Sequence, residues 1–155
     1  MIEIRRAAAS DHKALSAIRR SAILELAVAA MPPSQALRWA NQAATDRVTR
    51  AISHHAVWVA VEEAPIGWVE VDRDRVAALY VAFRCCGQGI GSRFLLHAEA
   101  AIRDGGYAVA RLETSANAAA FYSNRGYLPC GVRNADGALP MSKPVEGVNE
   151  GWEND

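Results

Sequence analysis

The sequence has no surplus of charge of either sign. Its 155 residues include 17 basic and 17 acidic side chains, which leaves a net charge of zero. Proteins that bind nucleic acid usually carry a basic excess, because phosphate groups attract it. No apolar run approaches the roughly 20 residues that cross a bilayer. We therefore expect neither nucleic acid nor a membrane as a partner.

Cysteine is also scarce. Three cysteines, of which Cys85 and Cys86 are adjacent, are too few for the disulfide framework of a small secreted domain. Adjacent cysteines rarely bridge each other, and no Cys/His spacing completes a zinc site, so we expect no metal. The chain opens with a strand-like run, Ile2–Ile4, rather than a secretory leader. These features favour a cytoplasmic location.

The remaining composition is that of an ordinary globular protein. Apolar residues make up 51% of the chain and charged residues 22%. This length favours one domain, which buries about two-thirds of its unfolded surface. From Glu146 onward the chain is polar and contains glycine, which is typical of a loose tail. We expect one domain over residues 1–145 and a tail over 146–155.

Apolar periodicity and turn residues predict the order of the elements. The predicted strands are 2–6, 56–61, 66–71, 76–83, 109–114, 128–133 and 138–141, and the predicted helices are 11–26, 34–52, 90–102 and 118–125. Leu37 and Val48 belong to the expected buried stripe of the second helix, and Asn117 is the expected cap of the last. Gly67 is expected at a bulge or a crowded crossing.

The connections predict how the strands pair. Short turns join the three middle strands, so these should form an antiparallel meander. A helix joins the fourth strand to the fifth, so that pair should be parallel. The expected fold class is α/β, a mixed and mostly antiparallel central sheet flanked by helices. Such a sheet lacks the repeated βαβ units of a dinucleotide-binding domain.

A glycine-rich turn lies between the fourth strand and the following helix. Gly87, Gly89 and Gly91 alternate with Gln88 and Ile90. Without Cβ atoms, backbone N–H groups at such a turn can point outward together, and the helix start adds a partial positive charge. The turn therefore predicts a phosphate-binding site. A glycine-rich turn without any ligand remains the alternative.

Two familiar phosphate-binding motifs do not fit this turn. A Walker loop needs a lysine after the last glycine, and Ser92-Arg93 has none there. A dinucleotide fingerprint needs a third glycine where Ser92 stands. The turn instead resembles the coenzyme A loop of the GNAT superfamily of N-acyltransferases, in which Arg or Gln is followed by two residues, Gly, one residue, and Gly or Ala. Cys86 departs from that pattern, because it occupies the position of the Arg or Gln.

A second motif resembles the same superfamily. Asn117-Ala118, Phe121-Tyr122 and Gly126-Tyr127 follow the glycine turn at the family's usual distance, and the closing run Pro140–Pro144 is also similar. The resemblance covers residues 56–145 best and the first fifty residues more loosely. It implies a GNAT-like fold with acetyl-CoA as co-substrate.

The resemblance also implies which residues bind the coenzyme. Amides of the glycine turn would bind its diphosphate, and backbone groups of Leu79 and Val81 would bind the pantetheine arm. The full implied set is Leu79, Val81, Cys86, Gly87, Gln88, Gly89, Ile90, Gly91, Ser92 and Asn117. Since backbone groups would do most of this work, Cys86 would weaken coenzyme binding without abolishing it.

Catalytic roles follow from the same resemblance. Tyr122 would donate a proton to the departing thiolate, since a phenol is protonated at neutral pH. A core aromatic is its alternative role. Glu70 and Glu113 are candidates for the base that deprotonates the amine, and His54 and His55 could also titrate in range. Each of these four has the alternative of a solvated strand or loop residue.

The expected function is that of an N-acetyltransferase. An amine of a small-molecule or protein acceptor would attack the thioester of acetyl-CoA directly. A non-catalytic acyl-CoA-binding or sensory module is the alternative, because Cys86 departs from the motif and the base is unassigned. A homodimer is left open.

Overall fold

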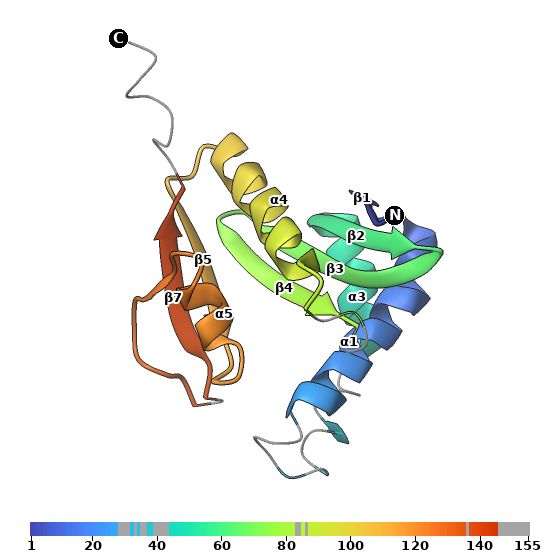
Figure 1. Ribbon diagram of the computed structural model, residues 1–155, viewed down its shortest axis with the longest axis horizontal. Helices are drawn as coiled ribbons and strands as arrows, with labels where there is room; N and C mark the ends of the chain where they lie inside the picture. The colour runs from blue at the N-terminus through green and yellow to red at the C-terminus, as the bar shows by residue number, and fades with distance from the viewer. Residues whose placement is uncertain are drawn as a thin grey trace. The chain divides into compact units, whose positions relative to one another are not determined.

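The computed structural model describes residues 1–27, 32, 34, 37, 38, 44–82, 85, 87–135 and 137–145 (Figure 1). At residues 26, 27 and 44–46 only the backbone is described. Cys86 and the tail expected at 146–155 lie outside these residues. The elements are β1 (Glu3–Arg6), α1 (His12–Ala27), α3 (Ala44–His54), β2 (Ala56–Glu62), β3 (Ala64–Asp72), β4 (Arg75–Val81), α4 (Ile90–Asp104), β5 (Val109–Thr114), α5 (Ala119–Ser123), β6 (Leu128–Pro129) and β7 (Leu139–Pro144).

The strands of the described residues form one mixed sheet. Its order is β1-β2-β3-β4-β5-β7-β6. Antiparallel pairing joins β1 to β2, β5 to β7 and β6 to β7. Turns of one and two residues join β2 to β3 and β3 to β4, and turns this short connect antiparallel neighbours. β4 pairs with β5 in parallel, with Arg75 opposite Arg111. The predicted mixed, mostly antiparallel α/β sheet is confirmed.

Residue contacts divide the chain into two compact units. The first unit comprises Met1–Glu70 and Ala78–Leu96, and the second comprises Val71–Ala77 and His97–Asp155. The two units are described one at a time below.

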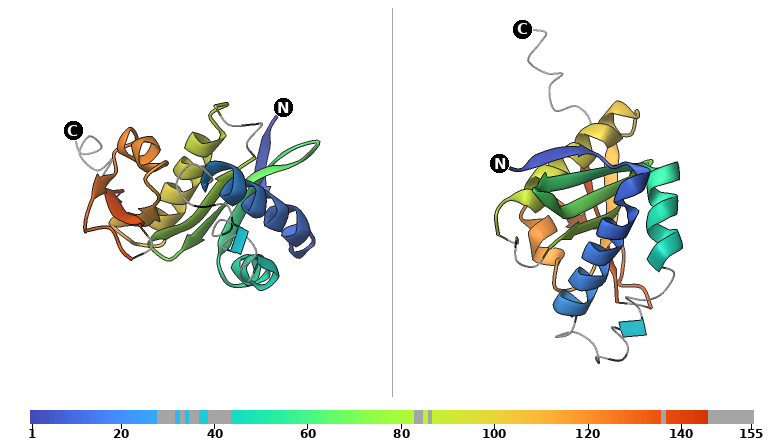
Figure 2. Two further views of the ribbon diagram at one scale, coloured as in Figure 1. Left: turned by 90° about the horizontal axis from the view of Figure 1, so that it is seen from below. Right: turned by 90° about the vertical axis from the view of Figure 1, so that its right-hand side faces the viewer.

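Helices α1 and α3 cover one face of the sheet in the first unit (Figure 2). Leu15 and Ile18 of α1 pack with Val48 of α3 against the strands. Trp68 of β3 is fully buried among them, and its Nε1 donates a hydrogen bond of 3.0 Å to the carbonyl oxygen of Leu15. The recurrence of buried residues at three- and four-residue spacing explains why the sequence pattern located α1.

The helix predicted over 34–52 is only partly recovered. In the described residues α3 begins at Ala44, and residues 34, 37 and 38 are also helical. Val48 is buried as expected, but Leu37 is 44% exposed, so its expected burial is wrong. The periodicity aligned Leu37 with Val48, yet a period cannot indicate how far along a helix the core extends.

Gly67 marks a close approach between β3, β4 and the first turns of α4. A Cβ at this position would lie 2.8 Å from the carbonyl oxygen of Tyr80 and 3.0 Å from the Phe94 ring. The first distance is shorter than Cβ atoms show in proteins and the second is tighter than usual, so only glycine fits without a shift of the backbone. The expectation of a crowded crossing is confirmed.

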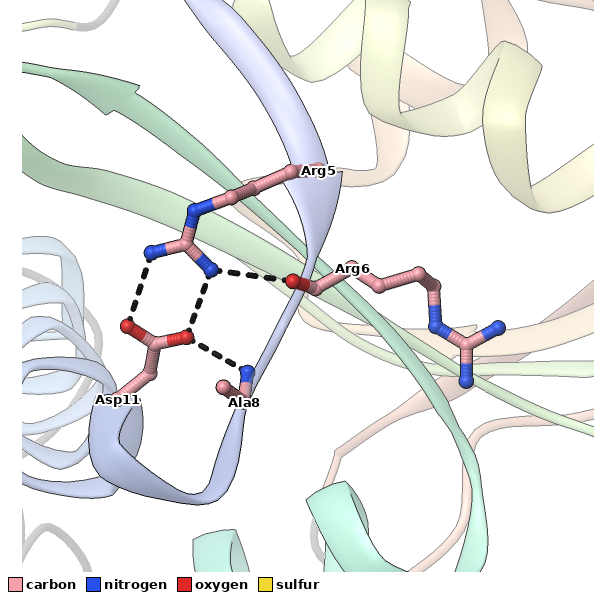
Figure 3. Close-up of polar contacts among 4 residues, drawn as sticks. All are labelled: Arg5, Arg6, Ala8 and Asp11. Atoms are coloured by element: carbon pink, nitrogen blue, oxygen red, sulfur yellow. Dashed lines mark hydrogen bonds and ion pairs between the residues drawn. The ribbon is translucent and has the colours of Figure 1, made fainter.

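A salt bridge secures the connection from β1 to α1 (Figure 3). The two terminal nitrogens of Arg5 lie 2.9 and 3.1 Å from the two carboxylate oxygens of Asp11. Asp11 also accepts a 2.7 Å hydrogen bond from the amide of Ala8. These donors lower the pKa of Asp11: the Arg5 hydrogen bond contributes most, the Ala8 amide adds to it, and burial opposes both.

The second unit is built on β5 and β7. Ala110 and Leu112 of β5 and Met141 of β7 are buried, and Tyr127 is fully buried. α4 ends at Asp104, and Gly106, whose φ is 93°, follows it; the Tyr107 amide donates to the Ile102 carbonyl at 3.2 Å. A glycine with positive φ just after the last turn is typical of a helix C-terminus.

Two expectations in this unit are wrong in detail. The N-cap of α5 is Ala118 rather than Asn117, because the helix starts one residue later than predicted. The strand predicted over 128–133 ends at Pro129. The Cys130 amide still donates to the Pro140 carbonyl at 2.9 Å, but Pro140 has no N–H group to donate in return, so the ladder ends there.

Candidate active site

The glycine turn is open at the start of α4. Gly87 and Gly89 have φ angles of 87° and 79°, in the left-handed region that favours glycine. A Cβ at either position would have no heavy atom within 4 Å, so no described side chain fills the turn. The first ladder bond of α4 runs from the Arg93 amide to the Gly89 carbonyl at 3.1 Å. The helix therefore begins at the turn, and the first amides of a helix can form an anion site.

The residues of the turn and of the helix start differ in how far they are buried. Gly87, Gln88 and Gly89 are exposed, and Gly91 and Ser92 are half-buried. Ile90 is 1% exposed, so its side chain belongs to the core and its backbone alone remains available to a ligand. Cys86 lies outside the described residues, so its implied role stays a prediction.

Leu79 and Val81 lie on β4, the strand that leads into the turn. Both are half-buried, and they alternate with Tyr80, whose ring centroid lies 5.3 Å from that of Trp68. The Ala82 amide donates to the Ile66 carbonyl at 2.8 Å, so the pairing with β3 continues to the end of β4. The first unit therefore contains the strand, the glycine turn and the helix start that the resemblance requires, in sequence.

Tyr122 is a buried residue of α5 in the second unit. Its ring makes edge-on contacts with Phe121, at 5.0 Å between centroids, and with Tyr127, at 5.8 Å. These contacts fix the ring plane and fit both of the roles considered for it, proton donor and core aromatic. Asn117 is exposed in the turn before α5.

Glu70 is a buried carboxylate on β3 in the first unit, with 1% of its surface exposed. Arg47 Nη2 lies 2.7 Å from its Oε1, at ion-pair distance but without hydrogen-bond geometry. His55 Nδ1 lies 2.5 Å from its Oε2. His54, the next residue, is exposed and its Nδ1 lies 3.3 Å from the Arg50 carbonyl. Sequence reasoning named Glu70 and His55 separately but missed both their contact and Arg47.

Glu113 differs from Glu70 in its surroundings. It lies on β5 in the second unit, opposite Pro140 of β7, and its side chain is exposed. An exposed carboxylate can meet an incoming amine directly. The carboxylate of Glu70 instead meets other protein groups at both oxygens.

A second buried carboxylate was not found from the sequence. Glu99 of α4 is 6% exposed; it accepts a hydrogen bond of 2.9 Å from the Tyr127 hydroxyl and lies 3.2 Å from Lys143 Nζ. Burial raises the pKa of Tyr127 above its ordinary value, and the negative charge of Glu99 raises it further. Tyr127 is therefore a protonated core residue.

Two further observations concern the described part of the chain. It contains no group of three His, Cys, Asp or Glu side chains placed to hold a metal ion. None of its helices is both long enough and apolar enough to cross a membrane.

Comparison with known proteins gives one family and one fold. The sequence model of the acetyltransferase (GNAT) domain matches residues 27–143. A comparison with curated proteins found no match. Among solved structures, a GCN5-related N-acetyltransferase from Rhodopseudomonas palustris is similar, with a TM-score of 0.83 and 22% identity over 92% of this chain and 94% of that chain.

Two other solved structures extend the comparison. The PaiA N-acetyltransferase of Thermoplasma acidophilum, in complex with coenzyme A, has a TM-score of 0.79 and 19% identity over 93% of this chain and 99% of that chain. The ribosomal-protein-S18-alanine N-acetyltransferase of Escherichia coli has a TM-score of 0.68 and 18% identity over 97% of this chain and 98% of that chain. At these identities, the likeness shows a shared fold.

Proposed function

The chain belongs to the GNAT family of acetyltransferases, and we propose that it transfers the acetyl group of acetyl-CoA to a primary amine. The observation that carries this proposal is the open glycine turn at the start of α4. Two exposed glycines in the left-handed region lead directly into the amides of a helix N-terminus. This arrangement attracts a diphosphate by dipole and hydrogen bonds together.

The residues of the first unit fit coenzyme A. Amides of Gly87, Gly89, Gly91 and Ser92 would bind the diphosphate, since the space beside the first two is open. Backbone groups of Leu79 and Val81 would align the pantetheine arm along β4. The departure at Cys86 removes one side chain from the family pattern and leaves this backbone set intact.

The coenzyme supplies a thioester, and the protein supplies the proton transfers. The amine nitrogen bonds to the thioester carbonyl carbon, and the carbon–sulfur bond breaks. A backbone N–H near Val81 would stabilise the negative charge on the carbonyl oxygen. Tyr122 would protonate the leaving thiolate, and Glu113 or Glu70 would receive the proton of the amine.

The acceptor class is a primary amine on a small molecule or a protein. The acetyltransferase of ribosomal protein S18, which shares this fold, acts on a protein, as its name states. A non-catalytic acyl-CoA-binding module is the second candidate. The burial of Glu70 favours it, because a carboxylate that is 1% exposed and in contact with Arg47 and His55 is less accessible to a substrate amine than an exposed base would be.

The proposal is tested by incubating the purified chain with acetyl-CoA and a panel of polyamines, amino acids and peptides. Release of free thiol that depends on both protein and amine is the expected result. Binding of coenzyme A is measured in parallel by calorimetry. Binding without thiol release across the panel would favour the non-catalytic module, and absence of binding would refute both candidates.

A further inference from the structure

A groove of about 490 Å³ lies in the second unit, where a two-residue turn joins β3 to β4. It is lined by Asp72, Arg73, Asp74 and Arg75 around the turn and by Tyr107 in the connection from α4 to β5. A groove of this volume can hold a small molecule, since ligand pockets commonly measure about 300–1,000 Å³. None of these residues belongs to the glycine turn or to the implied coenzyme set, so a ligand in the groove would be separate from the co-substrate.

The charged side chains at the groove leave one positive charge without a partner. Asp74 Oδ2 accepts a hydrogen bond of 3.1 Å from Nε of Arg111 on β5. Asp72 Oδ1 lies 3.5 Å from Nε of Arg73. Within the described part of the chain the Arg75 side chain makes no hydrogen bond or ion pair, and the residue is exposed. Each carboxylate therefore faces one guanidinium, and the guanidinium of Arg75 remains available to a ligand.

The sheet register places two of these arginines side by side. Arg75 and Arg111 are partners in the parallel pairing of β4 with β5, and partners on neighbouring strands point to the same face of a sheet. Like charges in this relation repel each other, and Asp74 compensates only one of the two. A bound anion would remove the remaining repulsion. Because a planar guanidinium binds carboxylate or phosphate through two parallel hydrogen bonds, the groove favours a ligand that carries one of these groups.

Arg73 has a backbone conformation that disfavours arginine. Its φ is 60°, in the left-handed region that favours glycine. The side chain is 79% exposed, and its 3.5 Å contact with Asp72 is a surface ion pair, which contributes little to stability. Glycine would therefore suit the turn better than arginine does. An arginine that the fold does not require fits a role in binding a ligand.

We propose that the groove binds a small aromatic anion, with Arg73 and Arg75 holding its carboxylate or phosphate and Tyr107 contacting its ring. Tyr107 is 37% exposed, so its ring has a free surface on which a flat ligand can stack. Arg75 begins β4, whereas Leu79 and Val81, which would align the pantetheine arm, lie near the end of that strand. The proposed ligand is therefore bound by other residues than acetyl-CoA, and its binding does not depend on acetyl transfer.

Calorimetric titration with three matched probes tests the class of ligand. Benzoate and phenyl phosphate carry a carboxylate and a phosphate on the same ring, and benzamide is an uncharged analogue of benzoate. At least one of the two anions should bind, and benzamide should bind roughly tenfold or more weakly, because it lacks the charge that the arginines recognise. The anion that binds more tightly identifies the preferred group. No binding of either anion, or equal affinity for benzamide, would overturn the proposal.

Paired variants test whether the probe binds in the groove. Arg75→Gln should weaken anion binding roughly 10–100-fold, and Arg50→Gln, the same change at an exposed arginine of α3, should not. Arg73→Gly should weaken binding without lowering the melting temperature. Its control is Glu63→Gly, in the turn between β2 and β3, where φ is 66°. Wild-type affinity in a folded Arg75→Gln protein would overturn the proposal. No titration contains acetyl-CoA, so failure of the proposed acetyl transfer would not affect these results.

Discussion

The hydroxyl of Tyr127 lies 2.9 Å from Oε2 of Glu99, and both side chains are buried in the second unit. Lys143 Nζ lies 3.2 Å from each oxygen of the same carboxylate. The three residues come from α4, from the residues after α5 and from β7. A buried charge is tolerated here because two donors satisfy it.

We expect Tyr127→Phe to destabilise the fold. The substitution keeps the ring but removes one donor to Glu99, which leaves a buried acceptor less satisfied. The free energy of unfolding should fall by about 1–3 kcal/mol, measured by urea denaturation. Tyr107→Phe changes a tyrosine that is 37% exposed and serves as the control. Equal stability of the two variants would show that the Glu99 contact contributes nothing.

We expect Asp11 to make stability depend on acid pH. Because its pKa in the folded state is lowered, chiefly by Arg5, its contribution is complete above the ordinary carboxyl value near 4 and is lost as pH falls further. Asp11→Asn should cost about 1.5–3 kcal/mol at neutral pH, and the difference from wild type should shrink in acid. Urea denaturation from pH 7 to 2.5 measures it. Asp104→Asn, at the exposed end of α4, is the control, and a difference from wild type that is independent of pH would contradict the argument.

We expect Gly67→Ala to destabilise the first unit. The new methyl group would meet the Tyr80 carbonyl oxygen at 2.8 Å, and backbone cannot move aside as a side chain can. The loss should be about 1–3 kcal/mol or more in the free energy of unfolding. Gly105→Ala is the control, because its nearest neighbour is the edge of the exposed Tyr107 ring at 3.3 Å. Equal stability of the two variants would contradict the close contact between a Cβ atom at position 67 and the Tyr80 carbonyl oxygen.

Alanine substitutions at two glycines with the same backbone conformation distinguish a loss of stability from a loss of coenzyme A binding. Gly89 and Gly137 have φ angles of 79° and 85°, and a Cβ at either would have no neighbour within 4 Å. Alanine at either position should cost about 1–2 kcal/mol of stability through the left-handed backbone. Only Gly89→Ala should weaken coenzyme A binding in calorimetry. Equal affinities in the two variants would contradict the proposed diphosphate site.

We expect Tyr122→Phe to slow the reaction without changing coenzyme binding. The ring contacts with Phe121 and Tyr127 persist in the variant, while the transferable proton is lost. Turnover in the thiol-release assay should fall by roughly 10²–10⁴-fold, with affinity for coenzyme A unchanged. The Tyr107→Phe protein again provides the comparison. Full turnover in Tyr122→Phe would leave Tyr122 as a core aromatic.

Local signals explain what the sequence could predict. β5 matches the predicted strand 109–114 to the residue, because Arg111 and Glu113 alternate with apolar residues, a glycine pair precedes the strand and Ser115 follows it. Gly126 ends the α5 region with a φ of 97°, as a glycine after a helix indicates. The turn at Gly87 and Gly89 was located in the same way, since a positive φ and a helix start both leave a local sequence pattern.

Long-range contacts explain what could not be predicted. Arg47 precedes Glu70 by 23 residues and His55 precedes it by 15, and no period or motif relates them. Glu99 and Lys143 are separated by 44 residues. Such partners come into contact only because the strand order of the sheet brings their elements together. In addition, the local sequence around a charged strand residue does not indicate whether its side chain is solvated or buried.

The close approach at Gly67 also limits how this scaffold can be engineered. A saturation library at that codon would consist mostly of destabilised clones, since every other amino acid begins with the same clashing Cβ atom. The exposed residues 132–135 carry no such restriction. A display library intended to alter the protein should place its diversity there and leave codon 67 untouched.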